Sequence, residues 1–470
     1  MEFKRRRGNI LIIFEKISEI PLLLLSILFS AFLLNQFDKQ ALVPVIFILL
    51  SPVKKLVNYF FTYYTLTEEL LIVEAGVFNK KRTELPFSTI TTVDLSQNIL
   101  YQIFGVYKIK VDNASQTNET ANQSNINLTL KADEAIQFKK IIIGNSNETL
   151  NEQHETGAIK AEIRDFVKLG LLQSKIAYIM SIIAIIGSLT NFIVPFIKGK
   201  FGGGFIVAMI IPLIIIIYLI AVAMSIIKVV LKYYAFSVWA DEDTLKVQYG
   251  LFNKKSFSLQ KRKINGIILK QSFLMRVFKL YSAEVIVIGY GDKSEEGGSE
   301  QAIIFPIATK EKIREIVSIV LPEYSLDYSL CKPEKKAIRY FFFSPIFLFS
   351  VFCVIGAVIT AILINNYIVM ALAPVLLAFS VAHAMQKYIN AGISVGESNV
   401  VLCAGAFSKR IAIVKTKSIE SITASGSIFK RRKGIVSIRL GFVAPLRVAN
   451  ISSLNLPKEQ FELLEGVLKY

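Results

Sequence analysis

The sequence has few of the residues that most catalytic and metal sites use. Its 470 residues include three cysteines and two histidines. Cys331, Cys353 and Cys403 lie far apart and without a CxxC spacing, so neither a disulfide framework nor a zinc site is indicated. His154 lies in a polar segment and His383 near the end of an apolar run, where solvation or packing is a simpler interpretation than a proton relay. We therefore expect no catalytic residue, no metal site and no cofactor, and a protein that is not an enzyme.

Charged residues are also scarce. They make up 19% of the chain, against roughly a quarter in soluble domains, while hydrophobic residues make up 53%. This composition excludes a wholly soluble or disordered protein. The charge that remains is strongly basic, with a formal net charge of +18, which indicates an anionic membrane surface, a nucleic acid or the positive-inside requirement of membrane insertion. Because no basic stripe is interleaved with aromatic residues, we expect no nucleic-acid partner.

Long apolar runs occur in three closely spaced pairs. A transmembrane helix needs about 20 apolar residues, and polar flanking residues can extend the shorter runs. The pairs therefore predict six transmembrane helices in three hairpins. The six runs are Ile20 to Leu34, Ala41 to Val53, Ala177 to Ile197, Phe205 to Ile227, Phe341 to Ile364, and Tyr367 to Ala384.

Basic residues predict the orientation of the long polar segments. The N-terminal KRRR and the lysines beside the apolar runs place the N-terminus and these segments in the cytoplasm. Asn-x-Ser/Thr triplets such as the one at Asn113 would instead suggest a lumenal face in a eukaryote. An Ile-, Lys- and Asn-rich bacterial composition, in which such triplets arise by chance, is the simpler interpretation. We expect a multi-pass protein of the bacterial cell membrane. The flanking lysines are Lys54, Lys55, Lys228, Lys232 and Lys387.

A repeat follows the three pairs of apolar runs. Gly76, Gly250 and Gly405 each begin a Gly-x-Phe motif followed by two basic residues, at offsets of 174 and then 155 residues. Within each copy, alternating apolar residues predict about seven short strands. An amphipathic helix then closes each copy, over Ala132 to Ile143, Thr309 to Leu321 and Pro457 to Leu468. Such a unit is typical of a small β-barrel or sandwich capped by one helix, which is a PH-like outline.

The motifs of the first copy resemble those of a known family. LT-x-E, Gly-x-Phe with basic residues, Leu-Pro and Ile-x-x-Val occur in order between Thr65 and Val111. Together they resemble the bacterial PH-like (bPH2) membrane proteins, first catalogued as a domain of unknown function, and the three copies resemble its YdbT-type members. The resemblance implies a PH-like fold and supplies no catalytic residues. The third copy departs from the pattern, because Val395, Gly396 and Glu397 replace the LT-x-E turn.

These observations predict a fold class and a domain organisation. The predicted fold is an α+β membrane protein with six transmembrane helices in three hairpins, each hairpin followed by a PH-like small β-barrel or sandwich with a C-terminal helix. The predicted segments are an N-terminal basic segment with hairpin 1 (1–64), PH-like domain 1 (65–145), a polar linker (146–173), hairpin 2 (174–232), PH-like domain 2 (233–323), a linker (324–340), hairpin 3 (341–387) and PH-like domain 3 (388–470).

Charge differs among the three copies and suggests two functions. Lys and Arg exceed Asp and Glu in residues 228–339 and 386–470, but not in residues 54–173. The first hypothesis is a non-enzymatic membrane scaffold for envelope maintenance or stress protection. Its cytoplasmic domains would bind other membrane proteins, such as a smaller homologous PH-like subunit. The second is anionic-lipid binding or handling, because clustered basic residues attract anionic lipids, although positive-inside topology alone explains such clusters. The candidate lipid contacts are Lys261, Arg262, Lys263, Lys430, Arg431, Arg432 and Lys433.

Overall fold

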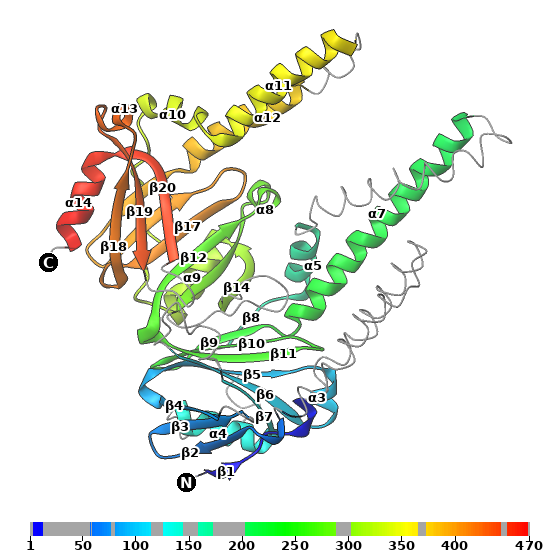
Figure 1. The fold of residues 1–470 in the computed structure, drawn as a ribbon, viewed down its shortest axis with the longest axis vertical. Helices are drawn as coiled ribbons and strands as arrows, with labels where there is room; N and C mark the ends of the chain where they lie inside the picture. Colours follow the sequence, from blue (N-terminus) through cyan, green and yellow to red (C-terminus); the bar gives the residue numbers. More distant parts are fainter. Residues whose placement is uncertain are drawn as a thin grey trace. The chain divides into compact units, whose positions relative to one another are not determined.

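The chain forms two compact units in a computed structural model (Figure 1). Unit 1 comprises residues 1–157 and 252–260, and unit 2 comprises residues 158–251 and 261–470. The structure describes residues 3–12, 57, 59–76, 80–113, 126–143, 158–172, 203–287, 302–364, 373–442 and 449–468.

Unit 1 contains the first copy of the repeat as two antiparallel sheets and a helix. Period-two alternation buries one face of each sheet, and the closing helix α4 (Ala132–Ile143) buries Ala135, Phe138 and Ile142 in the same core. Phe138 meets Tyr64 edge to face, with ring centroids 6.2 Å apart. The first sheet has the order β1 (Phe3–Arg6), β2 (Tyr63–Leu66), β3 (Leu70–Ala75), β4 (Lys81–Pro86), and the second contains β5 (Ile90–Gln97), β6 (Val106–Asn113) and β7 (Ile126–Lys131).

Unit 2 contains the third copy and most of the second. The closing helices α9 (Lys310–Val320) and α14 (Lys458–Leu468) lie where the amphipathic patterns predict them. The strands of the second copy are β9 (Ser237–Ala240), β10 (Thr244–Tyr249), β12 (Ile264–Gln271), β13 (Leu280–Val287) and β14 (Ala302–Thr309), and those of the third are β15 (Gly392–Val395), β16 (Asn399–Ala404), β17 (Lys409–Lys415), β18 (Ile419–Ser425), β19 (Ile435–Phe442) and β20 (Ala449–Pro457). Among the described residues the third copy thus has six strands, one fewer than the alternation predicts.

Sheets of consecutive copies are joined edge to edge. In unit 1, β5 pairs with β11 (Lys254–Gln260), which belongs to the second copy by sequence. In unit 2, β12 of the second copy pairs with β17 of the third. We call each of these two strand pairings a joint. Counted from β2, β9 and β15, each joint pairs the third strand of one copy with the fourth strand of the copy before it. The repeats are connected by backbone hydrogen bonds as well as by the chain.

The helices of unit 2 include long apolar elements. α5 (Ile163–Leu172) crosses α7 (Gly203–Tyr233) closely at Gly170, where an added Cβ atom would lie 2.7 Å from the Cα atom of Ile226. α10 (Ile338–Phe342) leads into α11 (Pro345–Ile364). α11 packs on α12 (Ala373–Asn390), and the Ser350 hydroxyl donates a hydrogen bond to the Ser380 hydroxyl over 2.8 Å.

The prediction of six transmembrane helices in three hairpins is wrong for this structure. Among the described residues, one helix, Pro345–Leu363, is long and apolar enough to cross a membrane. The first predicted pair, from Ile20 to Val53, and the run Ala177 to Ile197 lie outside the described residues. One physical reason is visible in α12, because hydropathy records composition, whereas a span also needs about 20 consecutive helical residues with few polar ones. α12 ends in Gln386, Lys387 and Asn390, so its apolar part is shorter.

Candidate membrane interface

Each copy places a short helix at the same turn of its second sheet. α3 (Ile99–Ile103), α8 (Phe273–Val277) and α13 (Ile428–Arg431) connect the fourth and fifth strands of their copies. The side chains of Asn98 and Ser272 accept hydrogen bonds from the backbone N–H groups of Tyr101 and Met275, 2.8 and 3.3 Å away. Such caps satisfy amide groups that a helix leaves free at its start. Local sequence therefore defines where α3 and α8 begin.

A residue two or three positions after each short helix reverses the chain in the left-handed region. Gly105, Lys279 and Gly434 have φ angles of 61°, 57° and 67°. A left-handed residue is the usual end of a helix and carries no steric cost for glycine. Lys279 adopts the same conformation, although it costs a residue with a side chain some free energy. The shape of this turn is therefore maintained in all three copies.

These short helices expose large apolar side chains. In α3 the exposed residues include Ile103, at 71%, and in the turn after α8 they include Phe278, at 62%. In α13, Phe429 is 72% exposed and Ile428 is similarly open. Full burial of such a side chain stabilises a contact by about 1.5–3 kcal/mol. Clustered exposed apolar residues mark membrane or protein contacts, and we call these three elements the apolar tips.

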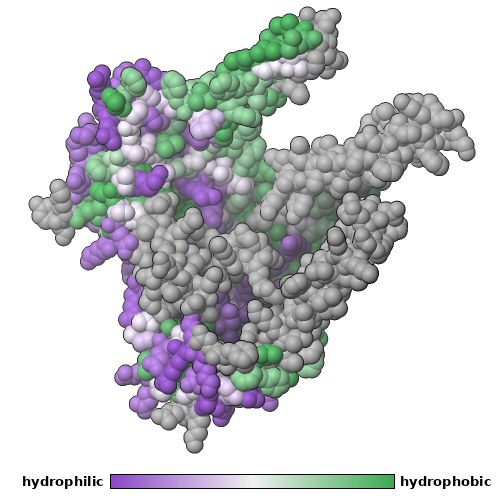
Figure 2. All heavy atoms as spheres, viewed as in Figure 1, coloured by the Kyte–Doolittle hydropathy of each residue, from purple (hydrophilic) through white to green (hydrophobic). Residues whose placement is uncertain are grey.

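The third apolar tip carries the basic cluster predicted from the sequence. Lys430 and Arg431 lie in α13, and Arg432 and Lys433 follow directly. By the repeat offset, Arg432 and Lys433 take the positions of the exposed Val277 and Phe278 in the second copy. The third tip therefore combines two exposed apolar residues with four basic ones. Figure 2 shows hydrophobic and hydrophilic atoms side by side over this part of the third copy. This combination is typical of surfaces that contact anionic lipids.

The third tip lies beside the segment that leads into the apolar helix α11. The Tyr340 hydroxyl of α10 donates a hydrogen bond to the Phe429 carbonyl over 3.1 Å, and the Lys430 ammonium lies 5.7 Å from the centre of the Tyr340 ring. Burial lowers the pKa of Lys430. α10 and α13 are neighbours in Figure 1. The basic residues of the tip thus lie close to the start of the one described helix that can span a membrane.

The second tip is joined to the other helix of this pair. The Arg276 guanidinium of α8 donates a hydrogen bond to Gln386 Oε1 of α12 over 2.6 Å. Phe407 lies between the two elements, edge to face with Phe273 at a centroid distance of 5.8 Å and tilted against Phe379 at 5.1 Å. The second and third tips therefore contact α12 and α10 respectively. We take this end of unit 2 as the candidate membrane interface.

The structure places the other predicted basic cluster elsewhere. Lys261, Arg262 and Lys263 form a short 3₁₀ helix before β12, whereas α8 follows the end of that strand. The eight residues of β12 separate the two by about 26 Å at roughly 3.3 Å per residue. Burial, and secondly the charge of Arg262, lower the pKa of Lys263 to about 8. The structure thus does not bring the two clusters to one surface.

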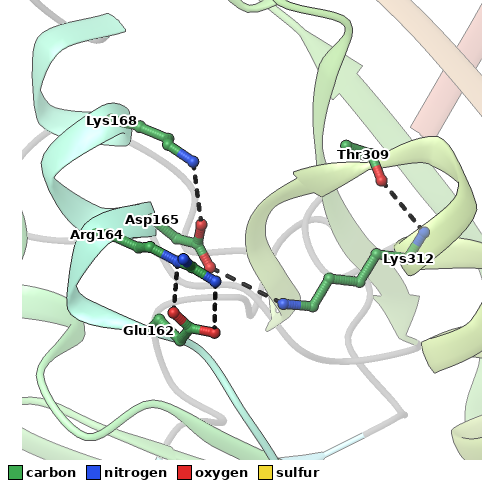
Figure 3. Close-up of polar contacts among 6 residues, drawn as sticks. All are labelled: Glu162, Arg164, Asp165, Lys168, Thr309 and Lys312. Atoms are coloured by element: carbon green, nitrogen blue, oxygen red, sulfur yellow. Dashed lines mark hydrogen bonds and ion pairs between the residues drawn. The ribbon is translucent and has the colours of Figure 1, made fainter.

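A polar cluster also lies between α5 and α9 (Figure 3). Asp165 lies 3.8 Å from the Lys168 ammonium and 3.9 Å from that of Lys312, and Glu162 pairs with Arg164. Each carboxylate has a basic partner, and such surface pairs contribute little energy. This arrangement links α5 to α9 and offers no unpaired acid or base. No group of three His, Cys, Asp or Glu residues that could hold a metal ion occurs in the described part of the chain.

Sequence reasoning missed the apolar tips. Their signal is a pair of apolar residues at each end of a short segment between two strands, as in Ile99-Leu100 and Ile103-Phe104. Such residues are usually assigned to a core. Their exposure became visible only when the sheets and the short helices were placed in space.

Comparison with known proteins gives one match for each copy. The model of the family described as "Bacterial PH domain" matches residues 22–145, 181–323 and 346–468. A curated relative, "UPF0699 transmembrane protein YdbT" of Bacillus subtilis (strain 168), is 23% identical over 394 residues, which are 80% of this chain and 78% of that protein. No solved structure matches the chain.

Proposed function

Because the chain belongs to the bacterial PH domain family, with one copy in each third of its length, we propose that it acts as a membrane-bound scaffold rather than an enzyme. Its PH-like domains bind other proteins at the cytoplasmic face of the bacterial cell membrane. The chain crosses the membrane more than once and serves envelope maintenance or stress protection. Its partners are membrane lipids and other membrane proteins, such as a smaller PH-like subunit, and it binds no nucleic acid.

The observation that supports this function is the way in which the copies associate. Six consecutive residue pairs form a ladder between β5 and β11, and six more form one between β12 and β17. Added strands bind through main-chain hydrogen bonds, which is a common mode of protein recognition. Strands that belong to different copies by sequence thus pair with one another within this chain. The membrane location is supported by the name of the YdbT relative and by the basic residues beside the apolar runs.

Co-purification tests the scaffold function. The tagged full-length protein is isolated from native membranes in mild detergent, and the proteins and lipids that accompany it are identified by mass spectrometry. The expected result is a protein partner in stoichiometric amount. Enrichment of one anionic lipid without any protein partner would contradict the scaffold and favour lipid handling.

Anionic-lipid binding is a second candidate, supported by the third tip. Ile428 and Phe429 are exposed beside four basic residues, and each basic residue near an anionic surface contributes about 1 kcal/mol. Replacing residues 430–433 by glutamine should reduce the phosphatidylglycerol retained by the purified full-length protein about tenfold or more. Replacing Lys261, Arg262 and Lys263 by glutamine is the matched control, because that cluster lies at the opposite end of its sheet. Equal retention by both variants would exclude a lipid site at the third tip.

A further inference from the structure

The two joints between copies use the same register. In the first, Ser256 of β11 lies opposite Leu95 of β5, and in the second, Ile411 of β17 lies opposite Leu269 of β12. Adding 174 to the number of each β5 residue and 155 to the number of its β11 partner gives a residue pair of the second joint. Register depends on which side chains face the core. Its repetition indicates that this joint is a property of the repeat rather than an accident of one pair of domains.

The strand that would form a third joint is at the edge of its sheet. β18 corresponds to β5 and β12, and its sheet has the order β18-β19-β20, so β18 has a strand on one side among the described residues. Ile264 and Ile267 of β12 are completely buried, whereas Ile419 and Ile422 at the corresponding positions of β18 are half-buried. The greater burial of the β12 isoleucines is consistent with the presence of β17, from the neighbouring copy, beside that strand.

Apart from Glu420 and the irregularity beside it, β18 lacks the features that protect edge strands. Natural edges carry lysine, proline or bulges that discourage further pairing. Residues 421–425 of β18, Ser-Ile-Thr-Ala-Ser, include neither a charge nor a proline. The irregularity between Ile419 and Ser421 also occurs between Ile264 and Gly266, where β12 nevertheless pairs with β17. The edge of β18 is therefore compatible with a further strand.

The chain also contains a strand of the complementary kind. β4 is the third strand of the first copy counted from β2, the position that β11 and β17 occupy in theirs, and among the described residues it ends the sheet β1-β2-β3-β4. Its last residue, Pro86, corresponds to Gln260, which follows the six paired residues of the first joint. The missing N–H group of this proline thus falls outside the ladder. β4 also carries Lys81, Arg82 and Glu84, but β11 and β17 begin with two basic residues each and pair nonetheless. One chain offers both halves of a joint, and head-to-tail contacts of this kind connect successive copies.

We propose that β18 of one molecule binds β4 of a second molecule of this protein in the register of the two internal joints. Thr423 then lies opposite Thr83, Ala424 opposite Arg82, and Ile422 opposite Glu84. This inference rests on the proposed scaffold function and names its partner as a second copy of the same chain. The repeated domains continue from one molecule to the next through antiparallel ladders.

Cysteine cross-linking in native membranes tests the proposed register. Two differently tagged full-length chains are co-expressed, one with Thr83→Cys and the other with Thr423→Cys, both in a Cys331→Ser, Cys353→Ala background. Cys403 remains because it is buried. Directly opposite residues have Cβ atoms about 4.5–5.5 Å apart, so oxidation or a short bismaleimide should link the two tags. Ala424→Cys in place of Thr423→Cys is the matched control, because its side chain points to the opposite face of the sheet.

The outcomes separate this inference from the scaffold function. Cross-linking that is at least about fivefold stronger with Thr423→Cys than with Ala424→Cys supports the joint, since adjacent residues of a strand face opposite sides. Equal or absent cross-linking, a link within one chain that carries both cysteines, or a link from Thr423→Cys to a different protein overturns it. In each of these cases a stoichiometric partner in the co-purification would still support the scaffold.

Discussion

The second and third copies of the repeat share strand order and closing helix but differ in what covers the fourth strand. β12 lies between β13 and β17, whereas β18 has β19 on one side in the part of the chain that the structure describes. The same alternation of apolar residues therefore gives a buried strand in one copy and a half-buried one in the other. The comparison teaches that burial in this protein depends on the neighbouring copy as well as on local sequence.

The largest expected effect compares equivalent isoleucines of the two strands. Ile267→Ala should lower the free energy of unfolding by about 2–5 kcal/mol, because the side chain is fully buried and its removal leaves a cavity. Ile422→Ala should cost about 1 kcal/mol or less, because that side chain is half-buried and surface-near truncations cost little. Denaturant unfolding of the full-length protein in detergent measures both values. Equal losses would show that β18 is as well covered as β12.

A smaller effect is expected where β12 approaches β17. Gly266 has no room for a side chain, since an added Cβ atom would lie 2.6 Å from the Ile413 carbonyl oxygen. Gly266→Ala should therefore destabilise unit 2 by about 1–3 kcal/mol, the usual cost of overpacking.

Gly466→Ala in α14 is the control for this glycine substitution. An added Cβ atom there meets nothing within 4 Å, and alanine is favoured over glycine inside a helix by about 1 kcal/mol. This variant should raise the melting temperature slightly while Gly266→Ala lowers it. A neutral Gly266→Ala variant would show that the two strands are less closely joined than the structure indicates.

The smallest effect concerns Lys263, whose equivalent in the third copy is Ser418. Burial lowers the pKa of Lys263 from 10.5 to about 8. Between these values the unfolded chain binds more protons than the folded chain, so stability rises with pH over this window. Below about pH 8 the folded protein bears the full free-energy cost of burying the charged Lys263 ammonium. Lys263→Ser should remove this rise, and urea unfolding at pH 7.5 and pH 10 compares the two proteins. An identical pH dependence in both would contradict the burial of this ammonium, although solvent screening keeps the effect small.

Local patterns predicted those parts of the fold that depend on local contacts. The closing helices follow from apolar spacing on one helix face, and strands such as β5 and β19 from period-two alternation. The repeat offsets also relate the registers of both joints. Among the described residues the third copy has six strands where about seven were predicted, and the prediction of six spans was wrong. Hydropathy of a run does not report where its helix becomes polar, as α12 does at Gln386 and Lys387.

The candidate interface was predicted only in part. Clustering of basic residues predicted Lys430–Lys433 and Lys261–Lys263 as equivalent candidates, but the structure places them at opposite ends of their sheets, since one precedes β12 and the other follows β18. The apolar tips were missed, because exposure of Phe278 or Phe429 depends on how a short helix projects from a sheet.

The sequence by itself determined the composition, the three copies, their alternating strands and their closing helices, because these depend on residues near one another in the chain. Tertiary structure decided which strand of one copy pairs with which strand of the next, and which apolar residues remain exposed. The paired residues of the joints are more than 100 positions apart, as for Ile267 and Ile413. Their contact arises from the free energy of burying two faces together rather than from any local preference.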